Sequence, residues 1–197
     1  LAGEAGTEEL VMRPPEWYRE HDIRLFTGVA IDRIDTGRRV VVADDGREEP
    51  FDLLLLATGS RAFVPPIQGA DLPGTFTFRD LADTEAMVRW ARERRRAVVV
   101  GGGLLGLEAA RGMAARGLEV SVAHLMDRLM EQQLDYPAAE ILKKEIEALG
   151  IEVLLEHSAG EICGSGRVEE IHFNNGAMRP ADMVVFATGT RPETKLA

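Results

Sequence analysis

The chain has 197 residues, of which 45% are hydrophobic and 28% are charged, a composition that excludes a disordered chain and fits one large or two small globular domains. Its formal net charge of −10 offers no electrostatic attraction to nucleic acid or to an anionic membrane surface. The single cysteine excludes an internal disulfide and a cysteine-ligated cluster, and no apolar run approaches the roughly 20 residues that span a bilayer.

The first third of the chain predicts a short helix followed by strands. Residues 1–13 have weak periodicity and are expected to be a loop, whereas Pro14-Pro15 opens a helix because proline is tolerated in a first turn. Hydrophobic patterning predicts four strands, at residues 23–28, 29–35, 38–44 and 51–58. The turn signal Asp44-Asp45-Gly46 indicates that two of them form part of an antiparallel meander.

A proline- and glycine-rich stretch at residues 63–74 predicts a boundary between a first domain, 1–75, and a second domain, 76–197. In the second domain, buried-strand patterns alternate with helical patterns. The expected strands are residues 97–100, 119–125, 151–156, a pair joined by Asn174-Asn175-Gly176, and 183–189. The alternation predicts a Rossmann-like α/β fold, in which a parallel sheet with helices and right-handed crossovers carries an added antiparallel β-meander.

The three helices expected in this domain are defined by their caps and their apolar faces. The first runs to about residue 95 and is capped by Asp80 or Asp83. The second follows the glycines at residues 101–106 and places Leu104, Leu107, Ala110 and Ala114 on one face. The third begins near Pro137, ends at Gly150 and is expected to bury Ile141, Leu142, Ile146 and Leu149.

The segment from Gly101 to Gly106 has the pattern GxGxxG between a predicted strand and a predicted helix. We expect Gly101 to allow the sharp turn, Gly103 to let a pyrophosphate approach the backbone, and Gly106 to let helix and strand pack closely. The amides of Leu104 and Leu105 are expected to face the phosphates at the positive end of the helix dipole. The strand–loop–helix context favours a dinucleotide site over a glycine turn with a structural role alone.

The residue that reads the adenosine ribose usually lies about 20 positions further on, at the end of the second strand, where an acidic residue selects NAD. Here that position is His124. An imidazole can bond to a ribose hydroxyl, and together with Arg128 it could also accept a 2′-phosphate, so the choice between NAD and NADP stays open. The alternative is that His124 merely ends a strand at the surface.

One strand and its turn occur twice in the chain. LLLLATGSR, at residues 53–61, aligns with MVVFATGTR, at residues 183–191, and Asp45-Gly46 aligns with Asn175-Gly176. The offset is 130 residues in each case (183 − 53 and 176 − 46), which indicates a duplicated unit. The glycine loop matching residue 101 would then lie at 101 − 130 = −29, before residue 1. We therefore expect two lobes, of which the first is truncated.

These motifs together resemble those of the FAD/NAD(P)-dependent pyridine nucleotide-disulfide oxidoreductase superfamily. The markers are ATGSR at residues 57–61, GGGLLGLEAA at residues 101–110 and ATGTRPET at residues 187–194. Within that superfamily, residues 13–23 and 124–135 are most similar to the flavoprotein region of the assimilatory NAD(P)H nitrite reductase large subunit.

The resemblance implies that the first lobe holds FAD, that the second holds NAD(P)H, and that hydride passes from the nicotinamide to the flavin. It also implies that Gly189 lies along the nicotinamide and that Thr58, Gly59 and Arg61 border the flavin. Glu108 would help to position the cofactor, or would be a buried carboxylate satisfied by backbone amides. No side chain is expected to be a catalytic acid, base or nucleophile, since the cofactors carry the chemistry.

The departures from the superfamily pattern limit what this chain is expected to do alone. The first FAD-binding loop and the later Gly-Asp segment that contacts the flavin are absent, so the FAD site is incomplete and the fragment is expected to be inactive. In nitrite reductase, siroheme and a 4Fe-4S cluster reduce nitrite to ammonia, and the resemblance implies them only for the full-length protein. The alternatives are a rubredoxin- or ferredoxin-reductase-like oxidoreductase and a non-catalytic NAD(H)-binding module.

The remaining expectations concern partners, location and metal. The partners are NAD(P)H and the rest of a nitrite reductase polypeptide, with a homodimer as one option and neither nucleic acid nor membrane. The absence of a signal-peptide core and the single cysteine indicate the cytoplasm. The four histidines are too scattered for a local metal motif, and Cys163 and Trp90 are assigned to packing, so no metal site is expected.

Overall fold

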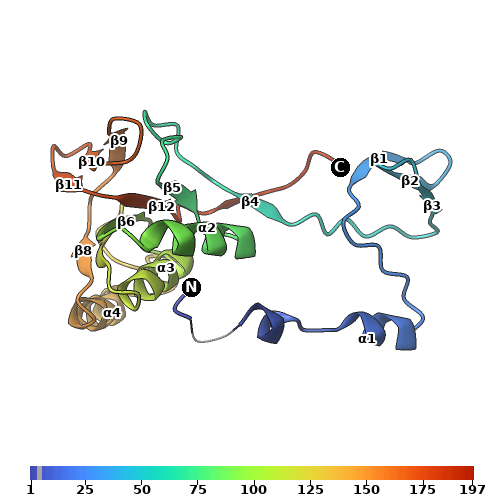
Figure 1. Ribbon diagram of the computed structural model, residues 1–197, viewed down its shortest axis with the longest axis horizontal. Coiled ribbons are helices and arrows are strands. Elements are labelled where there is room, and N and C mark those ends of the chain that lie inside the picture. The colour runs from blue at the N-terminus through green and yellow to red at the C-terminus, as the bar shows by residue number, and fades with distance from the viewer. Residues whose placement is uncertain (4–5) are drawn as a thin grey trace. The chain divides into compact units, whose positions relative to one another are not determined.

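The computed structural model describes residues 1–3 and 6–197 of the chain (Figure 1). These residues divide into two compact units. We call residues 61–191, which group with residues 1–3, the larger unit, and residues 6–60 with 192–197 the smaller unit.

The division between the units precedes the boundary expected at residue 75, because residues 61–74 group with the larger unit. Apolar side chains of this stretch pack against the core of the larger unit, namely Val64, Ile67, Ala70 and Leu72. The stretch leads into β5 (Thr75–Thr77), which pairs with the central sheet of the same unit. Proline and glycine therefore mark a packed connection within the larger unit.

The smaller unit contains a short helix and an antiparallel meander. Its elements are a 3₁₀ helix (Thr7–Leu10), α1 (Pro15–Glu20), β1 (Ile31–Asp35), β2 (Val40–Ala43) and β3 (Glu48–Pro50). Both β1 and β3 pair antiparallel with β2, so the predicted helix and meander are confirmed. The loop expected over residues 1–13 includes the 3₁₀ helix, and its residues 4 and 5 lie outside the described residues. The strand expected at residues 23–28 is wrong, because this segment has no regular structure.

The strand predicted at residues 51–58 is also absent, and the structure indicates why. Leu53 and Leu55 are 94% and 86% exposed. The aligned residues of the second copy form β12 (Met183–Phe186), which is fully buried between two parallel neighbours. A strand depends on ladder hydrogen bonds to its neighbours. Among the described residues no strand flanks residues 51–58, so their strand-like hydrophobic pattern has nothing to pair with.

The larger unit is built on a parallel sheet with the strand order β5-β12-β6-β7-β8. Its further strands are β6 (Arg96–Val100), β7 (Glu119–Ala123) and β8 (Glu152–Leu154), and its helices are α2 (Leu81–Ala91), α3 (Leu104–Ala114) and α4 (Tyr136–Ala148). Continuous apolar runs such as those of β6 and β12 are typical of strands that are covered on both faces. The predicted Rossmann-like parallel sheet is therefore confirmed.

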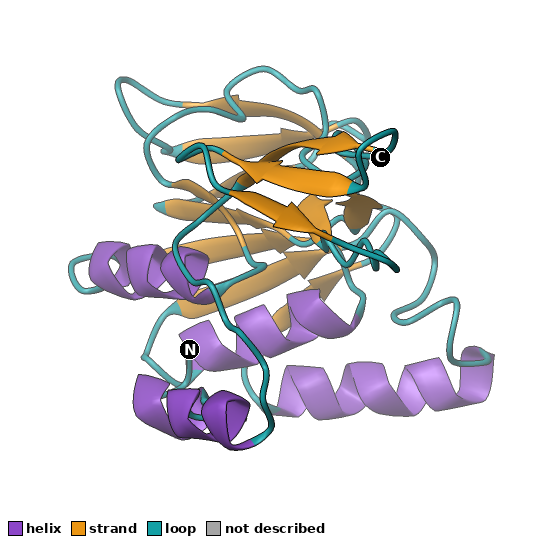
Figure 2. Cartoon of the chain, turned by 90° about the vertical axis from the view of Figure 1, so that its right-hand side faces the viewer, coloured by secondary structure: helices purple, strands orange, loops and turns teal. Residues whose placement is uncertain are grey.

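Alternate residues of the central strands enter two different cores. Val99 and Val185 join a cluster with side chains of α2, α3 and α4, whereas Val98 and Val184 join a cluster with side chains of the meander described below. This alternation follows from the two-residue period of a strand. The sheet thus has helices on one face and a meander on the other (Figure 1). Figure 2 shows the helices, strands and loops of the chain from a second side.

The caps of α2 and α4 are aspartates, and α4 buries only part of the apolar set that was expected. Asp80 caps α2 as predicted. Ile141 and Leu149 are 64% and 55% exposed, so their predicted burial is wrong. Ile146 is buried as predicted, Leu142 is partly buried against the same core, and Ala139 is buried in addition. Within the described residues, no helix is both long enough and apolar enough to span a membrane.

A second meander completes the larger unit and repeats the first. It consists of β9 (Ala159–Cys163), β10 (Glu170–Phe173) and β11 (Met178–Pro180), and the remaining strands, β4 (Ser60–Ala62) and β13 (Thr190–Pro192), pair with each other. The strand β9 is not among the strands predicted from the sequence. The bounds of β10 and β11 are those of β2 and β3 shifted by 130 residues, and the registers match. The predicted duplication is therefore also present in the structure.

Candidate functional site

A pocket of about 450 Å³ lies in the larger unit, where three neighbouring parallel strands end. Residues directly after β6, β7 and β12 line it, at Gly101, His124 and Ala187. In open α/β sheets, the carboxyl ends of strands around a change of strand order form the usual ligand crevice. The lining residues are Ala62, Phe78, Gly101, Gly102, Gly103, Leu104, Leu105, His124, Leu125, Met126, Glu131, Gln132, Gln133, Phe186, Ala187, Thr188, Gly189 and Thr190.

The glycines of the loop after β6 differ in their surroundings. At two positions a side chain would collide with the backbone, and at a third the neighbouring space is open. Gly101 has a φ of 123°, and a Cβ atom there would lie 2.3 Å from the carbonyl oxygen of Ala187. A Cβ atom on Gly106 would lie 1.9 Å from the carbonyl oxygen of Gly101, so only glycine permits this approach of helix and loop. A Cβ atom on Gly103 would meet nothing within 4 Å, which leaves room beside the loop.

The amino end of α3 faces this open space without a side-chain cap. Gly103 is its N-cap residue and has no side chain to accept a hydrogen bond, whereas Asp80 and Asp135 cap α2 and α4 through their carboxylates. The first-turn amides of a helix have no partner within the helix and carry a partial positive charge. Leu104 and Leu105, both exposed, line the pocket at this end. The arrangement suits an anionic group such as a diphosphate.

His124 is 8% exposed and both of its ring nitrogens have partners. The backbone N–H of Gly102 donates to Nδ1 at 3.0 Å, so the ring hydrogen lies on Nε2, which is 2.9 Å from Oε2 of Glu131. The histidine thus accepts a hydrogen bond from the glycine loop and holds the carboxylate of Glu131, which lines the pocket. The alternative that His124 merely ends a strand at the surface is wrong, because the residue is buried and both ring nitrogens have partners.

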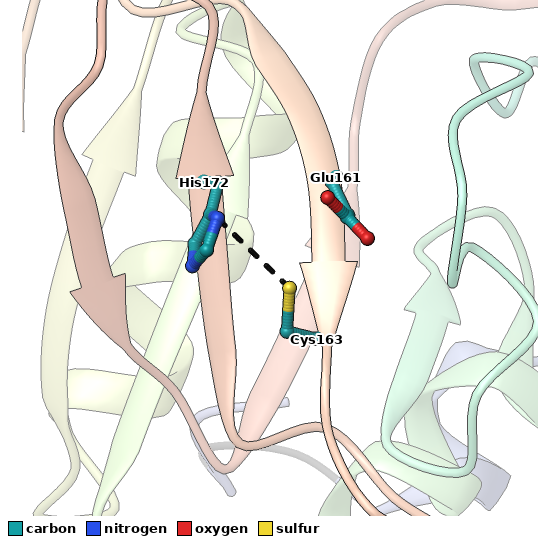
Figure 3. Close-up of side chains that lie close together, drawn as sticks. All are labelled: Glu161, Cys163 and His172. Atoms are coloured by element: carbon teal, nitrogen blue, oxygen red, sulfur yellow. Dashed lines mark hydrogen bonds between the residues drawn. The ribbon is translucent and has the colours of Figure 1, made fainter.

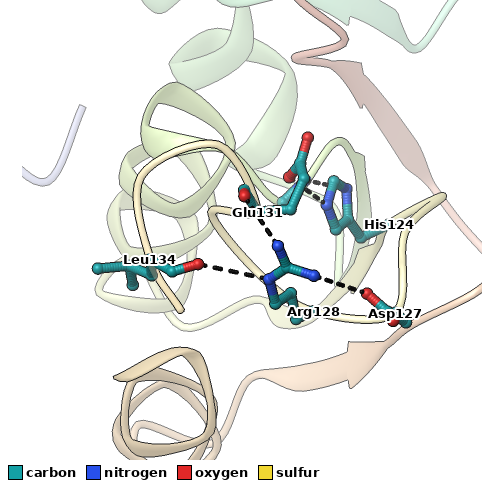
Figure 4. A network of polar contacts seen from close by, with 6 residues as sticks. His124, Asp127, Arg128, Glu131 and Leu134 are labelled. Atoms are coloured by element: carbon teal, nitrogen blue, oxygen red, sulfur yellow. Dashed lines mark hydrogen bonds and ion pairs between the residues drawn. The ribbon is translucent and has the colours of Figure 1, made fainter. Parts of the chain in front are cut away.

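Arg128 is held by contacts with neighbouring residues of its own loop and does not line the pocket. Its guanidinium contacts Asp127 at 3.3 Å and donates to the backbone oxygens of Leu134 at 3.4 Å and Glu131 at 3.1 Å (Figure 4). It also lies 4.4 Å from the ring centroid of Tyr136. Because these contacts occupy the guanidinium, it is poorly placed to receive a 2′-phosphate without rearrangement.

The other predicted site residues lie in different parts of the structure. Gly189 lines the pocket, whereas Glu108 is exposed on α3 and is therefore not the buried carboxylate considered as its alternative. Thr58 and Gly59 lie in the smaller unit, where the Thr58 hydroxyl donates to the carbonyl oxygen of Glu193 at 2.6 Å. Arg61 is exposed and does not line the pocket.

Several lining residues are not predicted from the sequence, above all the polar run Glu131-Gln132-Gln133. The signal was present, since this run lies in the segment quoted as a marker of resemblance, just beyond the strand that ends at Ala123. The ribose-binding role was assigned to the residue directly after the strand, so the sequence pattern did not single out Glu131. A loop that returns to the pocket places Glu131 there instead.

The comparisons with known proteins agree with this geometry. The family described as "Pyridine nucleotide-disulphide oxidoreductase" matches residues 3–197. The chain is 44% identical to "Nitrite reductase [NAD(P)H]" of Bacillus subtilis (strain 168), covering 100% of this chain and 24% of that protein. It is 31% identical to "Rubredoxin-NAD(+) reductase" of Pseudomonas putida, with 100% and 51% covered. The chain thus spans a quarter to a half of the length of these relatives.

The fold matches solved structures as well. The ferredoxin reductase for the CYP199A2 system of Rhodopseudomonas palustris superposes with a TM-score of 0.91 at 27% identity, over 97% of this chain and 47% of that one. The described residues therefore have the fold of a reductase over about half of that chain's length.

Proposed function

The chain belongs to the pyridine nucleotide-disulphide oxidoreductase family, and on this basis we propose that its larger unit binds NAD(P)H in the pocket at the end of β6. Enzymes of this family use FAD and NAD(P)H. The observation that carries the proposal is the open space beside Gly103 at the uncapped end of α3. A diphosphate there would accept hydrogen bonds from main-chain amides, and the low polarity of the surrounding glycine and leucine residues would strengthen them.

The proposed position of the cofactor follows from the lining residues. The adenosine half would lie toward His124 and Glu131, and the nicotinamide half toward Gly189. The bound nicotinamide supplies a hydride, which FAD accepts. The residues of this chain hold the cofactor and exclude water from it, and we assign no acid, base or nucleophile to the reaction.

We further propose that residues 1–75 contribute the last part of an FAD-binding domain and that residues 76–197 form the NAD(P)-binding domain. Thr58, Gly59 and Arg61 would border the flavin. The exposed leucines at residues 53–56 would pair with strands supplied by the rest of a longer polypeptide. Because the described residues supply only this part, we expect the chain by itself to retain FAD poorly and to be inactive.

For the whole protein we propose a cytoplasmic nitrite reductase that converts nitrite to ammonia. The 44% identity to a nitrite reductase over the whole chain supports this over the rubredoxin-reductase-like alternative, for which the identity is 31%. Siroheme and a 4Fe-4S cluster would belong to parts of that protein outside this chain. A homodimer is one option for its assembly. A non-catalytic NAD(H)-binding module is the second class of function and would use the same pocket.

The nucleotide site is tested by a valine at Gly103. Valine suits the extended backbone of this N-cap residue and meets no protein atom, so the variant Gly103→Val should fold. Its side chain would fill the space of the diphosphate, and we expect the affinity for NADH and NADPH to fall at least about 100-fold, a loss of about 2.7 kcal/mol. Isothermal titration calorimetry of both nucleotides measures this.

The matched control is Gly37→Val. Gly37 lies in a turn of the smaller unit, where a Cβ atom would make an ordinary 3.5 Å contact with the side chain of Asp35. We expect this variant to bind as the unmodified chain does. Equal affinities of Gly103→Val and the unmodified chain would refute the site. If the unmodified chain and Gly37→Val both bind the nucleotide but the longer polypeptide reduces no flavin with NAD(P)H, the non-catalytic module would be favoured.

A further inference from the structure

Four side chains with metal-binding chemistry lie together on the meander β9–β11, and none of them lines the pocket. Glu161 and Cys163 lie on β9, and His172 and Glu170 lie opposite them on β10. The isoleucine between each pair is buried in the core. Because strand residues alternate between faces, the four side chains share the outward face of the meander.

The distances within this cluster are short. The thiol sulfur of Cys163 lies 4.0 Å from Nδ1 of His172 (Figure 3). The potential ligand atoms of Glu161, Cys163 and His172 all lie within 4.8 Å of one another, and each of the three side chains is half-buried. The other ring nitrogen of His172, Nε2, lies 2.5 Å from Oε1 of Glu170.

We propose that Glu161, Cys163 and His172 bind a thiophilic divalent metal ion, Zn²⁺. Sulfur, imidazole nitrogen and carboxylate oxygen are the ligands that Zn²⁺ takes, at about 2.0–2.3 Å from the ion. Ligand atoms around one such ion lie about 3–4 Å apart, so side-chain adjustments of less than about 1 Å would bring the three onto it. Three protein ligands leave a fourth position for water, and binding releases the thiol proton to solvent.

Glu170 strengthens the inference because it orients His172 as metal-binding histidines are oriented. Such histidines donate their second ring N–H to a carboxylate or carbonyl oxygen, which directs the other nitrogen at the metal. With the hydrogen on Nε2 toward Glu170, the lone pair of Nδ1 faces Cys163. We therefore assign Glu170 as a positioning residue of the site.

The backbone beneath the cluster holds its ligands in register. The pairing of β9 with β10 places His172 directly opposite Glu161, and the carbonyl oxygen of Gln68 accepts the N–H of Ile162 at 2.9 Å from the other side of β9.

The experiment titrates the reduced chain with Co²⁺ and then with Zn²⁺. Cobalt bound to a thiolate has a sulfur-to-metal charge-transfer absorption, so we expect this band to saturate at one ion per chain and to disappear as Zn²⁺ displaces Co²⁺. Cys163→Ser should remove the band, and His172→Gln should weaken Zn²⁺ binding at least about 100-fold. Glu170→Gln should weaken it about 10–100-fold while keeping the band, as expected for an orienting residue.

The matched control is His21→Gln, since His21 is exposed in the smaller unit and its Nδ1 lies 2.7 Å from the backbone oxygen of Trp17. It should bind Zn²⁺ as the unmodified chain does, and circular dichroism verifies that each variant is folded. Absence of the charge-transfer band in the unmodified chain would overturn the proposal, as would Zn²⁺ binding that is unchanged in His172→Gln. The result is independent of the nucleotide titrations.

Discussion

At the scale of single residues, the glycines around the pocket differ in what a side chain would meet. Replacing Gly101 or Gly106 would force a side chain onto a backbone oxygen, so such variants would report on folding. Replacing Gly103 would fill space that the protein leaves open, so that variant reports on a ligand. The motif already predicts a different role for each glycine, and the surrounding atoms show which position leaves room for a ligand.

Glu131 is the residue from which we predict the choice of nicotinamide cofactor. Its carboxylate lines the pocket and is held by His124, whereas the guanidinium of Arg128 is occupied elsewhere. A 2′-phosphate beside this carboxylate would meet a like charge, which costs affinity. We expect the chain to bind NADH at least about tenfold more tightly than NADPH, a difference of about 1.4 kcal/mol.

Calorimetric titrations of Glu131→Gln test this prediction. The variant should bind NADPH more tightly than the unmodified chain and NADH no better, because the amide keeps the shape and loses the charge. Glu108→Gln is the matched control, since Glu108 is exposed on α3 outside the pocket. Tighter binding of NADPH than of NADH by the unmodified chain would contradict the assignment.

At the scale of elements, a single carboxylate ties together the starts of two central strands. Asp182 directly precedes β12, and its Oδ2 accepts the backbone N–H groups of Arg95 and Arg96 at 3.1 and 3.0 Å, where β6 begins. Its backbone oxygen accepts the indole N–H of Trp90 at 2.8 Å. Burial alone would raise the pKa of Asp182, but the backbone hydrogen bonds from Arg96 and Arg95, together with the charges of Arg96 and Arg94, outweigh it and lower the pKa.

The sign of this pKa shift predicts an acid-dependent loss of stability. The pKa of Asp182 is lower in the folded state than in the unfolded state, so its stabilisation is present above about pH 4 and is lost as the pH falls through the folded pKa. We expect Asp182→Asn to lower the free energy of unfolding at pH 7 by about 1–3 kcal/mol. On acidification, the free energy of unfolding of this variant should fall less than that of the unmodified chain.

Urea unfolding followed by tryptophan fluorescence between pH 7 and pH 3 measures both effects. The duplication provides the control, because Asp52 is the counterpart of Asp182 in the first copy and is exposed. Asp52→Asn should change the free energy of unfolding by less than about 0.5 kcal/mol at either pH. A loss at pH 7 that is equal in the two variants would show that Asp182 has no special role.

At the scale of the whole molecule, the two units have unequal cores. The larger unit buries the four residues of β12 between neighbouring strands, whereas the aligned leucines 53–56 of the smaller unit are exposed. A hydrophobic run with unpaired backbone groups is a template for pairing with another chain. We expect the isolated chain to self-associate through this run at concentrations at which nucleotide binding is measured.

Leu55→Lys tests the expectation, because a charge in such a run opposes edge-to-edge pairing. Size-exclusion chromatography with light scattering should show a smaller mean mass for this variant than for the unmodified chain, with the affinity for NADH unchanged. Leu149→Lys is the matched control, since Leu149 is an exposed leucine at the end of α4. A monodisperse monomer of the unmodified chain would contradict the prediction.

Most of the fold was predictable because local patterns and local caps agreed with it. The run of valines in β6, the glycines after it and the cap at Asp80 each depend on neighbours in the sequence, and the structure contains the elements that they predict. The constant offset of 130 residues was likewise visible in the sequence, and the strand pairs β2–β3 and β10–β11 repeat it in register.

The remaining features depended on contacts between residues far apart in the chain. The sequence by itself determined the parallel sheet, the glycine loop and the duplication, since these follow from hydrophobic period, backbone freedom and repeated spacing. Only the tertiary structure decided that leucines 53–56 form no strand, that Glu131 returns to the pocket, and that His172 lies opposite Glu161 beside Cys163. The physical reason is that the pairing of a strand and the path of a loop depend on contacts with residues that are distant in the sequence, and the local sequence does not specify those residues.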